Sequence, residues 1–325
     1  MTAEKEKIIV TGVNGFVGEH LARHLRESDF YVHGIGREET PNKNVAPYLD
    51  SYEAGDLLIK ERVAKLSLKK ARAIIHLAGL ASVADSFNQP ELYKTGNAEM
   101  TDNLLTEASS QGFEGRFVAV SSGALYDGSD DMPLTELSRV AESSPYATGK
   151  LRAEAIVKRH RMNGLDAVIA RPFNHIGPGQ DKGFLVSDLY DQLIKAYEDG
   201  SKQISVGNLS TRRDYTDVRD IVAAYAKLAS APRLIYDTYN VASRKSYSGF
   251  EILDYLKNAM SLKEIEPIVD QARVRPTDAM DIIGDSSRLK NELNWETLSS
   301  PETAINDFVA RRQAEANESS ETLVA

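Results

Sequence analysis

The sequence contains no cysteine. Disulfide bonds, zinc sites built from thiolates and a cysteine nucleophile are therefore excluded together. Long hydrophobic runs are missing as well, since no stretch approaches the roughly 20 apolar residues that a membrane-spanning helix requires. The first ten residues, MTAEKEKIIV, lack the apolar segment of a secretion signal. We therefore expect a cytoplasmic protein with no membrane partner.

A surplus of basic residues is also missing. The chain carries 39 Lys and Arg against 48 Asp and Glu, which gives a formal net charge of −9. Affinity for nucleic acid comes largely from neutralising phosphates, so an acidic chain without a basic run is a poor nucleic-acid binder. The six histidines show no metal-ligand spacing with one another or with acidic residues. The sequence predicts neither a nucleic-acid partner nor a metal site, although local arginines can hold a small anionic ligand.

The first 170 residues alternate short apolar runs with helical patterns. Near-continuous apolar runs suit strands buried on both faces, and the segments between them are long enough for crossover helices. This repetition predicts the α/β class, with a Rossmann-type, doubly wound parallel sheet. The five runs are Lys7–Val10, Tyr31–Ile35, Ala71–Leu77, Arg116–Ser121 and Ala167–Ala170.

The pattern changes after Arg171, where prolines and glycines gather over residues 172–183 and predict a loop. We assign residues 1–171 and about 210–243 to the sheet domain. A smaller, mostly helical lobe takes about 172–209 and 244–312, and the polar tail 313–325 is expected to be frayed. The elements predicted after the loop are a helix at Leu185–Tyr197, a strand at Ile204–Val206, a strand and helix within Tyr215–Ser230, and a strand at Tyr239–Ala242.

A glycine turn follows the first strand. Gly12, Gly15 and Gly18 have the spacing G-x-x-G-x-x-G and lie directly before an amphipathic helix. Glycine lets backbone N–H groups approach a pyrophosphate, and the helix N-terminus adds its dipole. In this context the pattern predicts a dinucleotide site. The residues expected to bind the cofactor are Gly12, Asn14, Gly15, Phe16, Val17, Gly18, Arg37, Asp56, Leu57, Leu77, Ala78, Gly79, Tyr146, Lys150 and Arg171.

The residues after the second strand bear on the choice of cofactor. A carboxylate there binds the ribose 2′-hydroxyl of NAD, whereas an arginine accommodates the extra phosphate of NADP. The sequence offers Gly36-Arg37, which favours NADP(H). NAD(H) stays open, because Arg37 can equally be a solvated loop charge. We interpret His76, at the end of the fourth strand, as a packed structural residue.

Tyr146 and Lys150 stand four residues apart, and on a helix they share one face. A phenol has a reference pKa of about 10, too high for easy proton exchange near neutrality. A neighbouring cation favours the phenolate and brings it into a useful range. Ser122, at the end of the fifth strand, can hydrogen-bond a reacting oxygen. The three residues predict hydride transfer at a carbinol or ketone carbon.

These residues resemble the extended short-chain dehydrogenases/reductases. The glycine turn, the set of Ser122, Tyr146 and Lys150, and the segment Arg171–Asn174 carry the resemblance, which covers about residues 7–310. Within that family the chain is most similar to reductases of GDP-4-keto-6-deoxy-D-mannose that form GDP-D-rhamnose. The segments concerned are 171–180, 206–209, 213–220 and 275–276. The resemblance implies a GDP-linked 4-keto-6-deoxyhexose as substrate, bound by Ser82, Ser122, Gly123, Asn174, Asn208, Arg213 and Arg275, with the two arginines at its diphosphate.

The residues after Ser122 discriminate among the reactions of this family. Dehydratases of this group carry Glu two positions after the active-site Ser, where this chain has Ala124. A 4,6-dehydratase is therefore disfavoured, because it needs a carboxylate beside the tyrosine. Hexose 4-epimerases with tightly bound NAD tolerate a small residue there and are the first alternative. A non-catalytic NAD(P) sensor is expected to have lost Tyr146 or Lys150, and both are present.

The resemblance also implies a homodimer formed by the helix of Tyr146 and Lys150 and the helix before it. Leu104, Leu105, Ile156 and Val157 suit that contact, but they suit the sheet-facing core equally well.

Overall fold

The computed structural model of the chain describes residues 5–274 and 279–324. Its centre is a seven-stranded sheet with the order β10-β6-β5-β4-β1-β2-β3. Every neighbouring pair in it is parallel, which confirms the predicted doubly wound α/β fold. The strands are β1 (Lys7–Thr11), β2 (Tyr31–Gly36), β3 (Ser51–Ala54), β4 (Ala73–His76), β5 (Arg116–Val120), β6 (Ala167–Pro172) and β10 (Thr238–Val241).

Alternation along the strands fills both faces of the sheet. On β1, Ile8 and Val10 belong to one hydrophobic core and Ile9 to the other, and all three are fully buried. The first core lies under α1 (Phe16–Glu27), α7 (Val218–Ser230) and α9 (Ser287–Leu293). The second lies under α4 (Pro90–Ser110) and α5 (Pro145–Met162), with the short helix α2 (Lys60–Val63) at its margin. The short helix α3 (Val83–Asn88) contacts α4 and α5.

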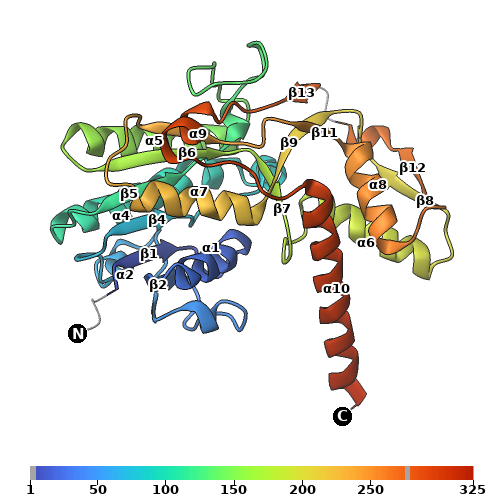
Figure 1. Ribbon diagram of the computed structural model, residues 1–325, viewed down its shortest axis with the longest axis horizontal. Coiled ribbons are helices and arrows are strands. Elements are labelled where there is room, and N and C mark those ends of the chain that lie inside the picture. Colours follow the sequence, from blue (N-terminus) through green and yellow to red (C-terminus); the bar gives the residue numbers. More distant parts are fainter. Residues whose placement is uncertain (1–4, 275–278, 325) are drawn as a thin grey trace.

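A second, smaller body stands beside the sheet domain (Figure 1). Its core holds Leu193, Ile252 and Phe308 from three helices and is separate from the two cores of the sheet. The helices are α6 (Leu185–Glu198), α8 (Gly249–Met260) and the first turns of α10 (Pro301–Val324). The strands of this body are β7 (Asn174–Ile176), β8 (Gln203–Val206), β9 (Arg212–Asp217), β11 (Ser246–Ser248), β12 (Glu266–Val269) and β13 (Asp281–Ile282).

Strand β9 corrects the boundary expected near residue 210. It pairs with β7, β11 and β13 and not with the central sheet, so only α7 and β10 of the segment 210–243 join the sheet domain. No sequence pattern predicted β11, β12 and β13, which are two to four residues long. Strands this short are held by their partners and carry too few residues to show a period.

Residues 313–324, expected from the sequence as a polar tail, lie in helix α10. Helix α10 continues through Gln313 to Val324, and its last turns extend away from both bodies (Figure 1). The segment AEANESSETL contains neither glycine nor proline, so nothing in it stops a helix whose first turns are already anchored. Two ion pairs tie α10 to the sheet domain: Arg311 with Glu19, and Asp307 with Arg219. None of the helices within residues 5–274 and 279–324 is long and apolar enough to cross a membrane.

Candidate active site

A cavity of about 670 Å³ opens at the carboxyl ends of the parallel strands, between the sheet domain and the second body. This edge is where open parallel sheets bind their ligands. Its lining brings together seventeen of the residues expected at the site. They are Gly12, Asn14, Gly15, Phe16, Val17, Gly18, Arg37, Asp56, Leu57, Leu77, Ala78, Gly79, Ser82, Ser122, Tyr146, Lys150 and Asn174.

The glycine turn is shaped for close backbone approach. Gly12 has φ +68°, and a β-carbon there would lie 2.8 Å from the backbone of Ala78. At Gly18 a β-carbon would lie 2.5 Å from the carbonyl oxygen of Val13, so the helix packs directly on the turn. Gly15 caps α1 without a side-chain hydrogen bond, which leaves the first N–H groups of the helix facing the cavity. The turn therefore fits a pyrophosphate.

Glu38 is a site residue that the sequence analysis missed. It lines the cavity directly after Arg37, whose own side chain is exposed. The Asn14 amide donates a 2.7 Å hydrogen bond to the Glu38 carboxylate and lowers its pKa below the usual value. The Tyr52 hydroxyl donates to the Glu38 carbonyl oxygen at 2.6 Å. The end of β2 therefore presents both an arginine and an ionised carboxylate, and reading two residues past Gly36 would have found it.

His76 is held between two threonines beneath the cavity. Its Nδ1 lies 2.8 Å from the Thr11 hydroxyl, and its Nε2 lies 3.3 Å from that of Thr101. Burial, with a smaller effect from the nearby Lys150 cation, lowers the pKa of His76 to about 3. The imidazole is therefore neutral near pH 7 and structural, as interpreted from the sequence.

Helix α5 presents the two central groups from its first two turns. The Ser144 hydroxyl accepts a 3.1 Å hydrogen bond from the N–H of Ala147, and Pro145 takes the first helical position. Tyr146 and Lys150 then fall on one face and both reach the cavity. A β-carbon on Gly149 would lie 2.0 Å from the carbonyl oxygen of Tyr93, so this glycine allows α4 and α5 to pack closely.

Burial dominates the electrostatics of this pair. It raises the pKa of Tyr146, and contact with the Ser122 hydroxyl partly offsets the rise. It lowers the pKa of Lys150 to about 8, against the opposing attraction of Glu154. The Lys150 ammonium donates a 2.9 Å hydrogen bond to the carbonyl oxygen of Val120, at the end of β5. Lys150 therefore remains mostly a cation at pH 7, fixed beside the phenol and the last strand residues.

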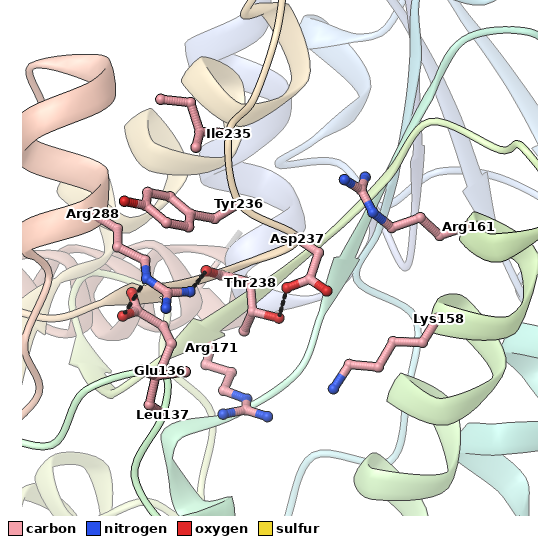
Figure 2. Close-up of a pocket in the computed structure, with 10 residues that line it drawn as sticks. All are labelled: Glu136, Leu137, Lys158, Arg161, Arg171, Ile235, Tyr236, Asp237, Thr238 and Arg288. Atoms are coloured by element: carbon pink, nitrogen blue, oxygen red, sulfur yellow. Dashed lines mark hydrogen bonds and ion pairs between the residues drawn. The ribbon is translucent and has the colours of Figure 1, made fainter.

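Arg171 does not line the cavity, in contrast to the expected cofactor contact. Its guanidinium is buried and donates two hydrogen bonds to the Glu154 carboxylate, at 2.8 and 2.7 Å, and a third to the Tyr126 hydroxyl at 3.0 Å. It faces a separate hollow of about 410 Å³, where Figure 2 shows it near Lys158 and Glu136. Alternation along β6 directs this side chain toward α5, so Arg171 has a structural role.

The remaining substrate residues lie outside the cavity lining or outside the described chain. Gly123 is buried beneath Phe173, whose ring would lie 2.9 Å from an added β-carbon. Asn208 is exposed and accepts a hydrogen bond from the N–H of Ser210 at 3.0 Å. Arg213 on β9 donates to the carbonyl oxygens of Arg212 and Ala279, at 2.7 and 2.8 Å. Arg275 lies outside the described residues.

The environment of Ala124 bears on the choice of reaction. The carboxylates that line the cavity within the described chain are Glu38, Asp56 and Asp181, and Ala124 lies in the lining where a dehydratase carries its glutamate. Asp127 is engaged by the Ser129 hydroxyl and by Arg139 and is not part of the lining. The cavity therefore offers hydroxyl and ammonium groups at Ser122, Tyr146 and Lys150, with no carboxylate at position 124.

Known proteins are similar to this chain over most of its length. The chain is 30% identical to GDP-6-deoxy-D-mannose reductase of Pseudomonas aeruginosa over 90% of this chain and 92% of the relative. It is 31% identical to GDP-6-deoxy-D-talose 4-dehydrogenase of Aggregatibacter actinomycetemcomitans, over 88% and 91%. UDP-glucose 4-epimerase of Pisum sativum is 26% identical over 91% and 92%. The solved structure of RMD from Pseudomonas aeruginosa complexed with NADPH superposes with a TM-score of 0.83 at 27% identity, covering 96% of this chain and all of that one.

The model of the NAD dependent epimerase/dehydratase family matches residues 8–242, which include the glycine turn, Ser122, Tyr146 and Lys150. These relatives modify nucleotide sugars, as reductases, dehydrogenases or epimerases. The chain therefore belongs to the NAD dependent epimerase/dehydratase family, and it is an NAD(P)-dependent enzyme that modifies a nucleotide sugar.

Proposed function

We propose that the protein reduces the C4 keto group of GDP-4-keto-6-deoxy-D-mannose and so forms GDP-D-rhamnose. The observation that carries the proposal is the cavity itself, in which Ser122, Tyr146 and Lys150 meet without a carboxylate at Ala124. These groups suffice for hydride transfer with proton donation, whereas dehydration needs a further acid or base. The similarity to a GDP-6-deoxy-D-mannose reductase supports this choice of substrate.

In this mechanism the Tyr146 phenol donates its proton to the C4 oxygen. A bound reduced nicotinamide would supply the hydride for C4, and with the proton from Tyr146 the carbon and the oxygen would each gain one hydrogen and the ketone would become an alcohol. Ser122 hydrogen-bonds the same oxygen and orients it toward the phenol. The Lys150 cation, anchored on the carbonyl of Val120, stabilises the phenolate that remains and holds the nicotinamide ribose.

We propose NADP(H) as the preferred cofactor and NAD(H) as the second. Arg37 can pair with a 2′-phosphate at the end of β2. Glu38 acts in the opposite direction, because an ionised carboxylate repels that phosphate and can accept a hydrogen bond from a free 2′-hydroxyl. The relative whose structure was solved with NADPH supports this order of cofactor preference.

The second body is proposed to hold the GDP moiety. Asn208 lies between β8 and β9 and Arg213 lies on β9. Arg275, outside the described residues, is assigned with them from the sequence. Guanidinium groups bind phosphate oxygens through charge-assisted hydrogen bonds, so the two arginines are assigned to the diphosphate. Asn174 and Ser82, which line the cavity, are assigned to the sugar.

We propose a cytoplasmic homodimer assembled through α4 and α5. Leu104, Leu105 and Val157 already belong to the core beneath these helices, which takes them out of the expected contact. The outward faces carry Leu92, Glu99 and Arg152 instead, all exposed in the single chain. Light scattering coupled to gel filtration measures the subunit number directly, and a monomeric mass would refute this assembly.

The test of the reaction is a coupled assay. A separate dehydratase converts GDP-mannose to its 4-keto-6-deoxy product, this protein is added, and the loss of nicotinamide absorbance is followed with NADPH and with NADH. We expect rapid oxidation of NADPH and a GDP-6-deoxyhexose whose C4 configuration, determined by NMR, is that of rhamnose. A folded protein that binds NADPH but oxidises none of it in this assay would refute the reductase.

Epimerisation at C4 of a nucleotide hexose is the second candidate. It is favoured by the small side chain of Ala124 and by the similarity to a UDP-glucose 4-epimerase. An epimerase returns the hydride to the sugar and keeps its NAD, so the purified protein would carry bound NAD and interconvert UDP- or GDP-hexoses without net oxidation. Extraction and chromatography of the bound nucleotide separate the two candidates.

A further inference from the structure

Two buried polar atoms in the wall of the cavity have no hydrogen-bond partner among the described residues. They are the Tyr225 hydroxyl and the Oε1 atom of Gln180. Buried polar groups in native proteins are nearly always paired, because an unpaired one has given up water without replacement. Both atoms therefore point to a ligand that completes them.

Of these two residues, Tyr225 gives the stronger indication of a bound ligand. Gln180 lies on the loop between β7 and α6, where a small movement can supply a partner. Tyr225 lies in the middle of α7, its side chain is fully buried, and its ring is packed in the core beneath β1 and β5. A side chain fixed in this way cannot easily turn its hydroxyl elsewhere, and the cavity that Tyr225 lines is the place from which a partner can reach it.

The position of α7 indicates which part of a bound ligand would lie at the Tyr225 hydroxyl. The helix lies against β4, β5 and β6 and beside α1. The carboxyl ends of those strands carry the groups around Ser122, and Lys150 is anchored on the last residue of β5. The glycine turn, which fits the pyrophosphate, lies at β1. Tyr225 therefore faces the half of the cavity that would hold the nicotinamide, from the side of the sheet opposite α5.

We propose that the Tyr225 hydroxyl hydrogen-bonds the carboxamide of the bound nicotinamide and fixes the rotation of the ring against Tyr146. The proposal rests on the NAD(P)-dependent function given above. A carboxamide carries one donor and one acceptor group, and a phenol hydroxyl can match either. Burial raises the pKa of Tyr225 far above its usual value, so the hydroxyl stays neutral and holds the ring without exchanging protons with the substrate.

The experiment compares Tyr225→Phe with the wild type in the absence of any sugar. Isothermal titration measures the affinity for NADPH and for 2′-phospho-ADP-ribose, which lacks the nicotinamide, and thermal unfolding measures the ligand-free protein. We expect the variant to bind NADPH roughly three- to tenfold more weakly, the effect of one neutral hydrogen bond. Affinity for 2′-phospho-ADP-ribose should be unchanged, and the ligand-free variant should unfold at the same temperature as the wild type or higher.

Tyr239→Phe is the matched control. Tyr239 is also fully buried, but its hydroxyl is bonded to Glu292 outside the cavity lining. Its loss should lower the unfolding temperature and leave both affinities unchanged. Equal affinity of Tyr225→Phe and wild type for NADPH, or equal weakening toward both nucleotides, would overturn the proposal. Because no sugar is present, these results are independent of whether the protein reduces a GDP-sugar.

Discussion

The buried pair of Arg171 and Glu154 gives a sharp prediction about stability. The two side chains are only 5% and 4% exposed, and the Glu154 carboxylate accepts three hydrogen bonds, two from Arg171 and one of 2.6 Å from the Ser121 hydroxyl. In Glu154→Gln an amide NH₂ group faces the guanidinium and the Arg171 charge is left buried without compensation. Breaking a buried pair in this way costs about 3–5 kcal/mol.

We therefore expect Glu154→Gln to lower the free energy of unfolding by about 3–5 kcal/mol, measured by urea denaturation followed by circular dichroism. Cofactor affinity of the folded variant should stay close to that of the wild type, because Arg171 does not line the cavity. Asp102→Asn is the control, since it removes an ion pair of 2.7 Å with Arg159. The side chains of Asp102 and Arg159 are 43% and 58% exposed. An exposed pair contributes at most about 1 kcal/mol.

Two results would refute this reasoning. A loss below about 1 kcal/mol in Glu154→Gln would mean that the pair is hydrated or easily replaced. A large loss of NADPH affinity in Glu154→Gln with unchanged stability would instead support the contact between Arg171 and the cofactor that the sequence predicted. Replacing both partners by apolar residues should recover part of the loss, because no buried charge then remains.

Three further predictions concern the cavity. Tyr146→Phe should bind NADPH normally in isothermal titration but turn over at least about a hundredfold more slowly in the coupled assay, because the proton donor is gone; full activity would refute its role. Glu38→Gln should raise the ratio of kcat/KM for NADPH to kcat/KM for NADH, because it removes a negative charge beside the 2′-phosphate. Arg37→Ala should lower the same ratio, because it removes a positive charge there. Unchanged ratios would contradict the assignment of both residues. The free energy of unfolding of the wild type, relative to that of Lys150→Met, should rise from pH 8 toward 10.5 in urea denaturation. Burial lowers the pKa of Lys150 in the folded state to about 8, so the unfolded chain binds more protons over this range. A difference that does not change with pH would show that Lys150 titrates normally.

The sequence by itself determined the elements whose signal is local. The run around Ile8–Val10 is buried on both faces of β1, and the other four predicted runs match strands of the same sheet to within about two residues. The glycine turn and the pair of Tyr146 and Lys150 were recognisable because their spacing reflects one turn and one helix face, each fixed by a few consecutive residues. Parallel strand order then brought these segments to one edge.

Tertiary structure decided the rest, because it depends on partners that are distant in the chain. Arg171 follows an apolar strand in the sequence, as a cofactor-binding residue would. In the structure it instead donates two hydrogen bonds to Glu154 on α5. Tyr225 reads as an ordinary core residue of α7, and only the packed structure shows that it lines the cavity and that its buried hydroxyl is unpaired among the described residues. β9 joins the second sheet because β7, β11 and β13 offer it hydrogen bonds. Local pattern thus fixes which segments become strands and helices, whereas pairing and burial, which decide what each polar side chain meets, arise only when the chain is packed.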